Sequence, residues 1–254
     1  MTTYSEVKAV NIVIREEIAS CVKQLRLSQN MVDMSINMGS EQEQQYFLDV
    51  LKGEVQYRKE IRIQKSIKNA GFYCMKSFED FRSDEVNMPS NLSIEQLRAG
   101  TFIEEKKNLV FYGKPGSGKT HLAQAIGLEA CKKGMNVKFY RTAALVNRLS
   151  EAKKAKELSS LMKQIQKADL IILDEWGYVP LDRDGSRLLF EIISECYEQK
   201  SIIVTTNIEF SKWATILYDE QMTNALLDRL LHHCYLLIFT GDSDRIKNSL
   251  IRMT

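Results

Sequence analysis

The sequence predicts an α/β protein in which a small all-helical N-terminal domain precedes a parallel five-stranded sheet with helices on both faces. Three observations support this fold. Strand-like and helix-like segments alternate between Asn108 and Phe239, which is the pattern of a parallel sheet covered by helices. A glycine-rich loop follows the first of these strands at residues 113–120. Residues 5–70 contain no proline and carry apolar residues at helical spacing.

The N-terminal domain is expected to span residues 1–70. Residues 37–40 interrupt its helical pattern, and Ser40 with Glu43 forms a capping box that predicts a second helix over 41–69. The first helix carries one apolar stripe at spacings of four and three. The stripe consists of Val10, Ile14, Ile18, Val22 and Leu25.

A connector over residues 71–107 is expected to lead into the last domain, 108–254. A turn at Pro89 precedes a short helix predicted at 94–99. The aromatic residues expected to pack on the following domain are Phe72, Tyr73, Phe78 and Phe81. Strands are predicted at 108–112, 136–140, 169–174, 201–206 and 235–239. Helices are predicted at 119–133, at 142–165 with a break, at 186–199 and at 222–232.

The loop after the first predicted strand has the spacing of a phosphate-binding P-loop. Glycines let successive backbone N–H groups turn toward phosphate oxygens, and the positive end of the next helix faces the same point. Lys119 is expected to reach the β- and γ-phosphates, and the Thr120 hydroxyl to hold Mg²⁺. The strand before and the helix after argue against a chance glycine turn. Nucleotide contacts are expected from Gly113, Lys114, Pro115, Gly116, Ser117, Gly118, Lys119, Thr120 and His121.

Two adjacent acids end the apolar strand predicted at 169–174. Acids at the end of a buried strand are costly unless they have a role there. Asp174 is placed to hold Mg²⁺, and Glu175 to polarise a water for attack on the γ-phosphate. Because parallel strands present their carboxyl ends at one edge of the sheet, the loop and the acids are expected to meet there. The combination predicts an ATPase rather than a passive nucleotide binder.

Composition excludes several classes of protein. The 254 residues carry a net charge of only +2, so bulk charge predicts no partner. Cys21, Cys74, Cys131, Cys196 and Cys234 are scattered, which argues for reduced thiols and against a disulfide framework or a zinc site. The adjacent His232 and His233 are interpreted as helix-end residues, because neighbours on a helix cannot share one face as metal ligands. We expect a cytoplasmic protein with no membrane partner, because neither a long apolar run nor a signal peptide is recognisable.

Two basic clusters are candidates for DNA binding. Contacts from such clusters to phosphates would give affinity that is independent of base sequence and sensitive to salt. The alternative is two solvated helix faces. The aromatic residues Tyr57 and Trp213 are expected in a core or an interface rather than as stacking platforms. The candidate residues are Arg58, Lys59, Arg62, Lys65 and Lys68, and then Lys153, Lys154 and Lys156.

Several motifs along the chain match those of one protein family. They are Gly-Ser-Gly-Lys-Thr-His-Leu-Ala at 116–123, Asp-Glu-Trp-Gly-Tyr-Val-Pro-Leu at 174–181, Leu-Leu-Phe-Glu-Ile-Ile-Ser at 188–194, Thr-Thr-Asn at 205–207, Phe-Ser-Lys-Trp at 210–213 and Ala-Leu-Leu-Asp-Arg-Leu-Leu-His-His at 225–233. Through them, nearly the whole chain resembles the IstB transposition helper ATPases, relatives of the DnaC helicase loaders in the initiator branch of AAA+ proteins. The chain departs from the usual family pattern at Trp176, at Val179 and at Cys74, where a proline is frequent. None of these departures touches the nucleotide chemistry, and the one at Cys74 bears on the path of the connector.

The resemblance implies roles for three further residues. Asn207 resembles the sensor-1 residue that positions the attacking water; the alternative is a turn residue that caps its strand. Arg229 resembles an arginine finger supplied by a neighbouring subunit; the alternative is an intrachain pair with Asp228 or an exposed helix charge. Arg245 resembles the sensor-2 arginine, and any helical lid around it is expected to be vestigial.

The resemblance also favours one of three functions. A transposition helper would assemble with ATP on double-stranded DNA as a homo-oligomer and recruit or stimulate a transposase. A helicase loader would use the same motor to grip a replicative helicase. A nucleotide-gated assembly protein without turnover is disfavoured, because Glu175, Asn207 and Arg229 are all present.

Overall fold

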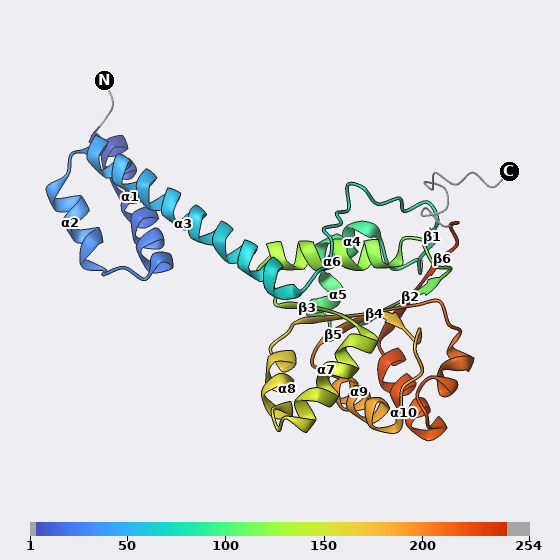
Figure 1. Cartoon of the computed structure of the whole chain (residues 1–254). Helices are drawn as coiled ribbons and strands as arrows, with labels where there is room; N and C mark the ends of the chain where they lie inside the picture. The colour runs from blue at the N-terminus through green and yellow to red at the C-terminus, as the bar shows by residue number, and fades with distance from the viewer. Residues whose placement is uncertain (1–3, 243–254) are drawn as a thin grey trace. The chain divides into compact units, whose positions relative to one another are not determined.

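The computed structural model describes residues 4–242, and these divide into two compact units at the boundary between Gln64 and Lys65. The first unit contains α1 (Tyr4–Leu25), α2 (Asn30–Met38) and the start of α3 (Glu41–Ala70), which runs on into the second unit (Figure 1). The helices predicted from the apolar stripe and the capping box are therefore confirmed. The sequence interpretation missed α2, because nine residues are too few for a long periodic pattern.

The predicted stripe forms the core of the first unit. Ile14, Ile18, Val22 and Leu25 are buried against Leu48 and Leu51 of α3. The side chain of Val10 lies outside the described residues. Both the backbone N–H and the hydroxyl of Ser40 donate to Glu43 Oε2 at 2.7 Å, and these bonds lower the pKa of the Glu43 carboxyl. The capping interaction thus marks the start of α3, as its sequence predicts.

The second unit is built on a six-stranded sheet. Its strands are β1 (Val86–Asn87), β2 (Asn108–Gly113), β3 (Val137–Arg141), β4 (Leu170–Trp176), β5 (Ser201–Thr206) and β6 (Cys234–Phe239), in the spatial order β1-β6-β2-β5-β4-β3. The five predicted strands are confirmed, and all of them are parallel. The additional β1 pairs antiparallel with β6 at Val86 and Phe239. Two residues are too short for an alternating pattern, so the sequence did not reveal this strand.

Helices cover both faces of the sheet, as Figure 1 shows. One face packs on α4 (Ile94–Ala99), α5 (Thr101–Glu104) and α6 (Lys119–Lys132), around a core that includes Phe111, Leu122 and Ile126. The other face packs on α7 (Thr142–Lys154), α8 (Leu158–Gln166), α9 (Arg183–Cys196) and α10 (Glu220–Leu231). The break predicted in the 142–165 helix lies between α7 and α8.

The connector aromatics pack on the sheet unit. Phe78 is buried in the core around α6, Phe72 and Phe81 pack against that core, and the Tyr73 ring lies 5.5 Å from the Phe139 ring. This part of the prediction is confirmed. Because residues 71–85 are held here, they lie along the carboxyl edge of the sheet, where the phosphate loop is.

Other predictions from composition can be compared with the described residues. All five cysteines are free thiols, as expected. Trp213 is fully buried and donates from its indole to the Ile208 carbonyl, whereas Tyr57 is 60% exposed and lies outside the core. Within residues 4–242, no helix combines the length and the apolar character needed to cross a membrane.

Candidate active site

The loop between β2 and α6 has the backbone conformation that its glycines allow. Gly116 and Gly118 have φ of 81° and 95°, and Gly118 is the residue from which α6 begins. At Gly113 an added Cβ would lie 2.4 Å from the Phe239 carbonyl oxygen, because β6 runs directly alongside. A side chain is therefore excluded at Gly113 by contact. The result is a loop whose backbone lies open at the N-terminus of α6, where an anion is favoured.

Lys119 is the first residue of α6, and its side chain folds back over the loop. The ammonium donates to the carbonyl oxygens of Gly113 and Lys114, each at 2.7 Å, and the residue is 7% exposed. These contacts hold the charge against the first two residues of the loop. A phosphate bound by the loop would lie within reach of the same charge.

Asp174 is fully buried at the end of β4. Its Oδ1 accepts hydrogen bonds from the hydroxyls of Thr120, at 2.9 Å, and Thr205. Its Oδ2 is buried and has no hydrogen-bond partner among the described residues. A buried carboxylate oxygen without a partner is costly, and carboxylate and hydroxyl oxygens are the ligands that Mg²⁺ prefers. Thr120 and Asp174 therefore fit the magnesium site that the sequence predicts.

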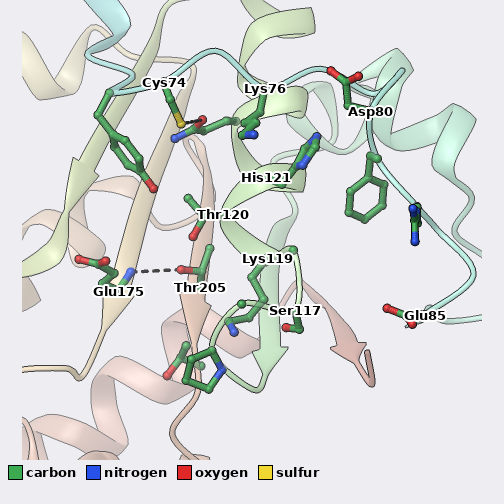
Figure 2. A pocket seen from close by; sticks show the side chains of 18 of the residues that line it. Cys74, Lys76, Asp80, Glu85, Ser117, Lys119, Thr120, His121, Glu175 and Thr205 are labelled. Carbon is green, nitrogen blue, oxygen red and sulfur yellow. Dashed lines mark hydrogen bonds between the residues drawn. The ribbon is translucent and has the colours of Figure 1, made fainter. Parts of the chain in front are cut away.

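Glu175 sits in a strained backbone conformation. Its φ is 59°, in the left-handed region, and the pairing of β4 with β5 is irregular between Leu173 and Trp176. The Glu175 N–H donates to Thr205 Oγ1 at 3.1 Å (Figure 2). The same Thr205 hydroxyl donates to Asp174 Oδ1, so it links both acids. The bulge re-aims the Glu175 side chain, which lines the cavity beside the loop. Backbone strain of this kind persists where surrounding contacts enforce it.

Arg141 joins Glu175 to the connector. Its Nε lies 3.5 Å from Glu175 Oε2, and its guanidinium lies 4.7 Å from the centre of the Tyr73 ring. Burial, followed by the nearby charge of Asp174, raises the pKa of the Tyr73 hydroxyl. Neither Arg141 nor Thr205 nor Tyr73 was among the predicted site residues. The Thr205–Thr206 pair at the end of an apolar strand was the one signal in the sequence.

A cavity of about 510 Å³ joins these elements. The connector forms one wall of the cavity (Figure 2). There His121 Nε2 lies 2.8 Å from the Ser77 carbonyl oxygen, and the His121 ring packs edge-on against Phe81. The volume of the cavity is typical of a site that binds a small molecule. The lining residues include Pro115, Gly116, Ser117, Gly118, Lys119, Thr120, His121, Glu175 and Thr205, together with Tyr73, Cys74, Lys76, Asp80, Phe81, Arg82 and Glu85 of the connector.

Asn207 and Arg229 do not line the cavity, and only Asn207 lies at the carboxyl edge of the sheet, because Arg229 stands five positions before the first residue of β6. Asn207 follows β5 directly, and its side-chain oxygen is buried without a hydrogen-bond partner in the described part of the chain. Arg229 lies on α10, where it donates to the Ala225 carbonyl at 2.8 Å and stacks 4.9 Å from the centre of the Phe190 ring. Neither contact involves Asp228. Arg245 lies outside the described residues.

The predicted DNA-binding residues are all exposed. Arg58 is already engaged: Nε donates to Glu54 at 2.6 Å and Nη1 to the Leu25 carbonyl at 3.1 Å. Lys153 lies 3.4 Å from Asp184. The Arg58 side chain therefore links α3 to the end of α1 within the first unit, a contact that the sequence did not indicate.

The histidine pair lies at the end of α10, as the sequence predicts, but its adjacency does not keep the two rings apart. Helix α10 ends at Leu231, so His232 and His233 follow it, and their ring centres lie 4.1 Å apart. Together with Glu198 they offer three ligand atoms within 4.8 Å of one another. All three residues are exposed, and His232 Nδ1 is 3.0 Å from the Tyr197 hydroxyl.

Comparison with known proteins agrees with this site. A family profile described as "IstB-like ATP binding protein" matches residues 19–251. An ATP-binding protein assigned to insertion sequence IS232 of Bacillus thuringiensis subsp. berliner is 37% identical over 198 residues, covering 77% of this chain and 78% of the relative. The corresponding protein assigned to IS21 of Pseudomonas aeruginosa is 35% identical over 185 residues, covering 73% and 70%.

A solved structure supports the fold. AMPPCP-bound DnaA from Aquifex aeolicus superposes with a TM-score of 0.53 at 22% identity, covering 70% of this chain and 57% of that one. The predicted α/β fold, a parallel sheet with helices on both faces and a phosphate loop, is thus confirmed. The family match spans both units, and the phosphate loop, the paired acids and the cavity all lie within it. The chain is therefore a P-loop ATPase and belongs to the IstB-like ATP-binding protein family.

Proposed function

We propose that the cavity binds ATP with Mg²⁺, and that Thr120 and Asp174 hold the ion. The observation that carries this assignment is the buried Asp174 Oδ2, which has no hydrogen-bond partner in the described chain. Mg²⁺ would supply charge neutralisation between the β- and γ-phosphates. The backbone of residues 113–118 would cradle the phosphates, and Lys119 would exchange its loop carbonyls for phosphate oxygens. His121 would brace the connector wall of the cavity through its contact with Ser77.

Glu175 would orient and polarise the attacking water, with Asn207, directly after the neighbouring strand β5, as a second polar group. The left-handed backbone at Glu175 and its bond to Thr205 support this role, because they aim the carboxylate into the cavity. Asn207 offers an unpartnered side-chain oxygen close to β4. Arg245 would act on the nucleotide of its own chain.

Arg229 would act on the nucleotide of a neighbouring chain. It does not line the cavity of its own chain, and its guanidinium is fixed on α10 by Ala225 and Phe190. A finger supplied in trans makes hydrolysis depend on contact between copies. The protein would then form an ATP-dependent homo-oligomer, in which hydrolysis releases the contact.

This motor would serve DNA transposition. The support is that the relatives at 37% and 35% identity carry the names of insertion sequences. The oligomer would bind double-stranded DNA through exposed basic residues, including Lys59, Arg62 and Lys65, and would recruit or stimulate a transposase. Loading of a replicative helicase is the alternative use of the same motor.

A Glu175→Gln variant tests the proposal. It should bind ATP normally and lose hydrolysis by about 100-fold or more, the range expected for loss of a general base. With ATP, it should remain on duplex DNA as an oligomer and retain a partner transposase in a pull-down. Unchanged turnover would refute the role of Glu175. Capture of a replicative helicase, with no capture of the transposase, would favour the loader.

A further inference from the structure

A cluster of metal-ligating side chains lies at the amino edge of the sheet, away from the cavity. Glu198, His232 and His233 offer three ligand atoms that all lie within 4.8 Å of one another. Glu198 lies shortly before β5 and the two histidines directly before β6, so the cluster lies where these parallel strands begin. The phosphate loop lies at the opposite edge, where the strands end. The proposed ATPase chemistry therefore does not use these three residues.

Two helices end at this cluster. α9 ends at Cys196 and α10 at Leu231, and Tyr197 and His232 are the residues that follow them. The Tyr197 hydroxyl lies 3.0 Å from His232 Nδ1, so the two helix ends lie together. The C-terminal end of a helix carries partial negative charge, which favours a cation. The negative ends of two helices and the Glu198 carboxylate therefore meet at one place on the surface.

Glu198 reaches the histidines from an unfavourable backbone conformation. Its φ is 55°, in the left-handed region that favours glycine. A strained residue of this kind persists where the surrounding structure holds it, and such residues cluster at functional sites. Here the strained residue carries a carboxylate whose Oε1 lies 3.8 Å from His233 Nε2. An ion pair with His233 would offset little of the strain, because exposed pairs contribute little to stability.

The donor set of the cluster favours a transition-metal ion over Mg²⁺. Imidazole nitrogens with a carboxylate oxygen are ligands that suit Zn²⁺, whereas Mg²⁺ prefers oxygen atoms alone. Because all three side chains are exposed, water can fill the fourth position of a tetrahedral site. Two ligands of one Zn²⁺ lie at most about 4 Å apart, twice the metal–ligand distance. Small rotations of exposed side chains can close the remaining gap.

We propose that Glu198, His232 and His233 bind a Zn²⁺ ion that joins the end of α9 to the end of α10. This inference goes beyond the proposed function, because none of the three ligands lines the nucleotide cavity. It also changes the interpretation of the histidine pair, which the sequence alone presents as helix-end residues. Arg229 of α10 stacks on Phe190 of α9, so the ion would also fix the two helices that hold this guanidinium.

Nuclear magnetic resonance of the full chain with ¹⁵N-labelled histidine tests the inference, because the sequence contains three histidines. With excess Mg²⁺ present, added Zn²⁺ should shift the ring nitrogens of His232 and His233 and leave those of His121 unchanged. His232→Gln and His233→Gln assign the two signals. The inference is overturned if neither ring responds to Zn²⁺ in molar excess, or if His121 responds at the same concentration as the pair.

The same titration, run against a competing chelator, gives the affinity of the cluster for Zn²⁺. Loss of a ligand in His233→Gln should weaken binding by at least about 100-fold, and Tyr197→Phe, which removes the hydroxyl that orients His232, by about tenfold. Glu198→Gln should weaken it by at least about tenfold. The matched control Glu195→Gln, an exposed acid on α9, should bind Zn²⁺ as the wild type does. Equal affinities in the two glutamine-for-glutamate variants would overturn the assignment of the carboxylate.

Thermal unfolding distinguishes metal binding from a purely structural role of Glu198. Zn²⁺ should raise the Tm of wild-type protein, because the site exists only in the folded chain. Glu198→Gly relieves the left-handed strain, so its Tm without metal should match or exceed that of the wild type. The same variant should nevertheless lose the rise with Zn²⁺. An equal rise in Glu198→Gly and wild type would refute the site, whereas the Glu175→Gln test of the ATPase is unaffected by either result.

Discussion

Arg141 Nε lies 3.5 Å from Glu175 Oε2, and the same guanidinium packs on the Tyr73 ring. The ion pair links the proposed catalytic carboxylate to the end of β3 and to the connector. Both partners are about half exposed, with side-chain exposures of 53% and 40%. The pair therefore restrains the carboxylate but contributes little to stability.

Replacing Arg141 should change turnover more than folding. Arg141→Gln removes the charge that holds the Glu175 carboxylate toward β3, so we expect basal ATP turnover to rise with little change in ATP affinity. The rise should stay within about fivefold, because an exposed ion pair is worth at most about 1 kcal/mol. Steady-state kinetics measure it, with Arg148→Gln, an exposed arginine outside the cavity, as control. A fall in turnover would show that Arg141 aims Glu175 productively.

Gly113 should tolerate no side chain. In Gly113→Ala the Cβ would lie 2.4 Å from the Phe239 carbonyl oxygen, so β2 and β6 must separate. We expect a loss of about 1–3 kcal/mol in the free energy of unfolding, typical of overpacking. Gly134→Ala is the control, since Gly134 also has a positive φ but meets nothing within 4 Å. Equal losses in urea denaturation would mean that backbone strain alone matters at both positions.

Arg229 should act across a subunit boundary. Arg229→Ala should lack hydrolysis because its finger is missing, and Lys119→Ala because it cannot hold the triphosphate. In a mixture, intact Arg229 of one variant can reach the intact phosphate loop of the other. We expect partial recovery of ATPase activity, greatest near equal amounts. Absence of recovery at every ratio would point to a role for Arg229 within its own chain.

The fold could be read from the sequence where periodic signals were long. The ends of the five parallel strands and of α6 were predicted within a residue or two. Each strand is a run of several apolar residues, and α6 carries apolar residues at helical spacing over several turns. The two-residue β1 and the nine-residue α2 gave no such signal. β1 forms because it pairs with β6, and α2 forms because it packs on α1.

The sequence predicted the site residues that belong to recognisable motifs and missed the others. The phosphate loop and the acids at 174 and 175 carry fixed spacing, so residue type alone identified them. Thr205, Arg141 and Tyr73 join the site through register and side-chain geometry. Thr205 lies beside Asp174 only because β5 pairs with β4. Such neighbours are set by the sheet order, which no local spacing encodes.

The exposed basic residues should differ in their effect on DNA binding. Arg62→Gln should weaken binding to duplex DNA of any sequence and reduce the slope of log affinity against log salt by about 1, as for one lost phosphate contact. Arg58→Gln should have a smaller effect on DNA but lower the stability of the first unit, because its guanidinium holds the Leu25 carbonyl and Glu54. Titrations at several salt concentrations, alongside thermal unfolding, distinguish the two. A sequence-dependent loss in Arg62→Gln would indicate base contact instead.

The buried Cys196 thiol should react only when the protein unfolds. Burial raises the pKa of the Cys196 thiol to about 12 from an ordinary value of 9.0, so the folded chain keeps this proton while the unfolded chain loses it. The stability due to this thiol is therefore complete below pH 9.0 and falls as pH rises toward 12. At about pH 8, Cys196 should resist an aromatic disulfide reagent until the protein unfolds.

Cys74 should behave differently from the buried thiols. It is half-buried, lines the cavity and lies 3.2 Å from Gln124 Oε1, so the reagent can reach it in the folded protein. Saturating ATP should slow its labelling, because the nucleotide would occupy the same cavity. Cys74→Ser identifies the reactive thiol, and Lys119→Ala should abolish the protection. Labelling of Cys74 at the same rate with and without ATP would mean that the nucleotide leaves this wall of the cavity open, and the assignment of the connector to the site would be wrong.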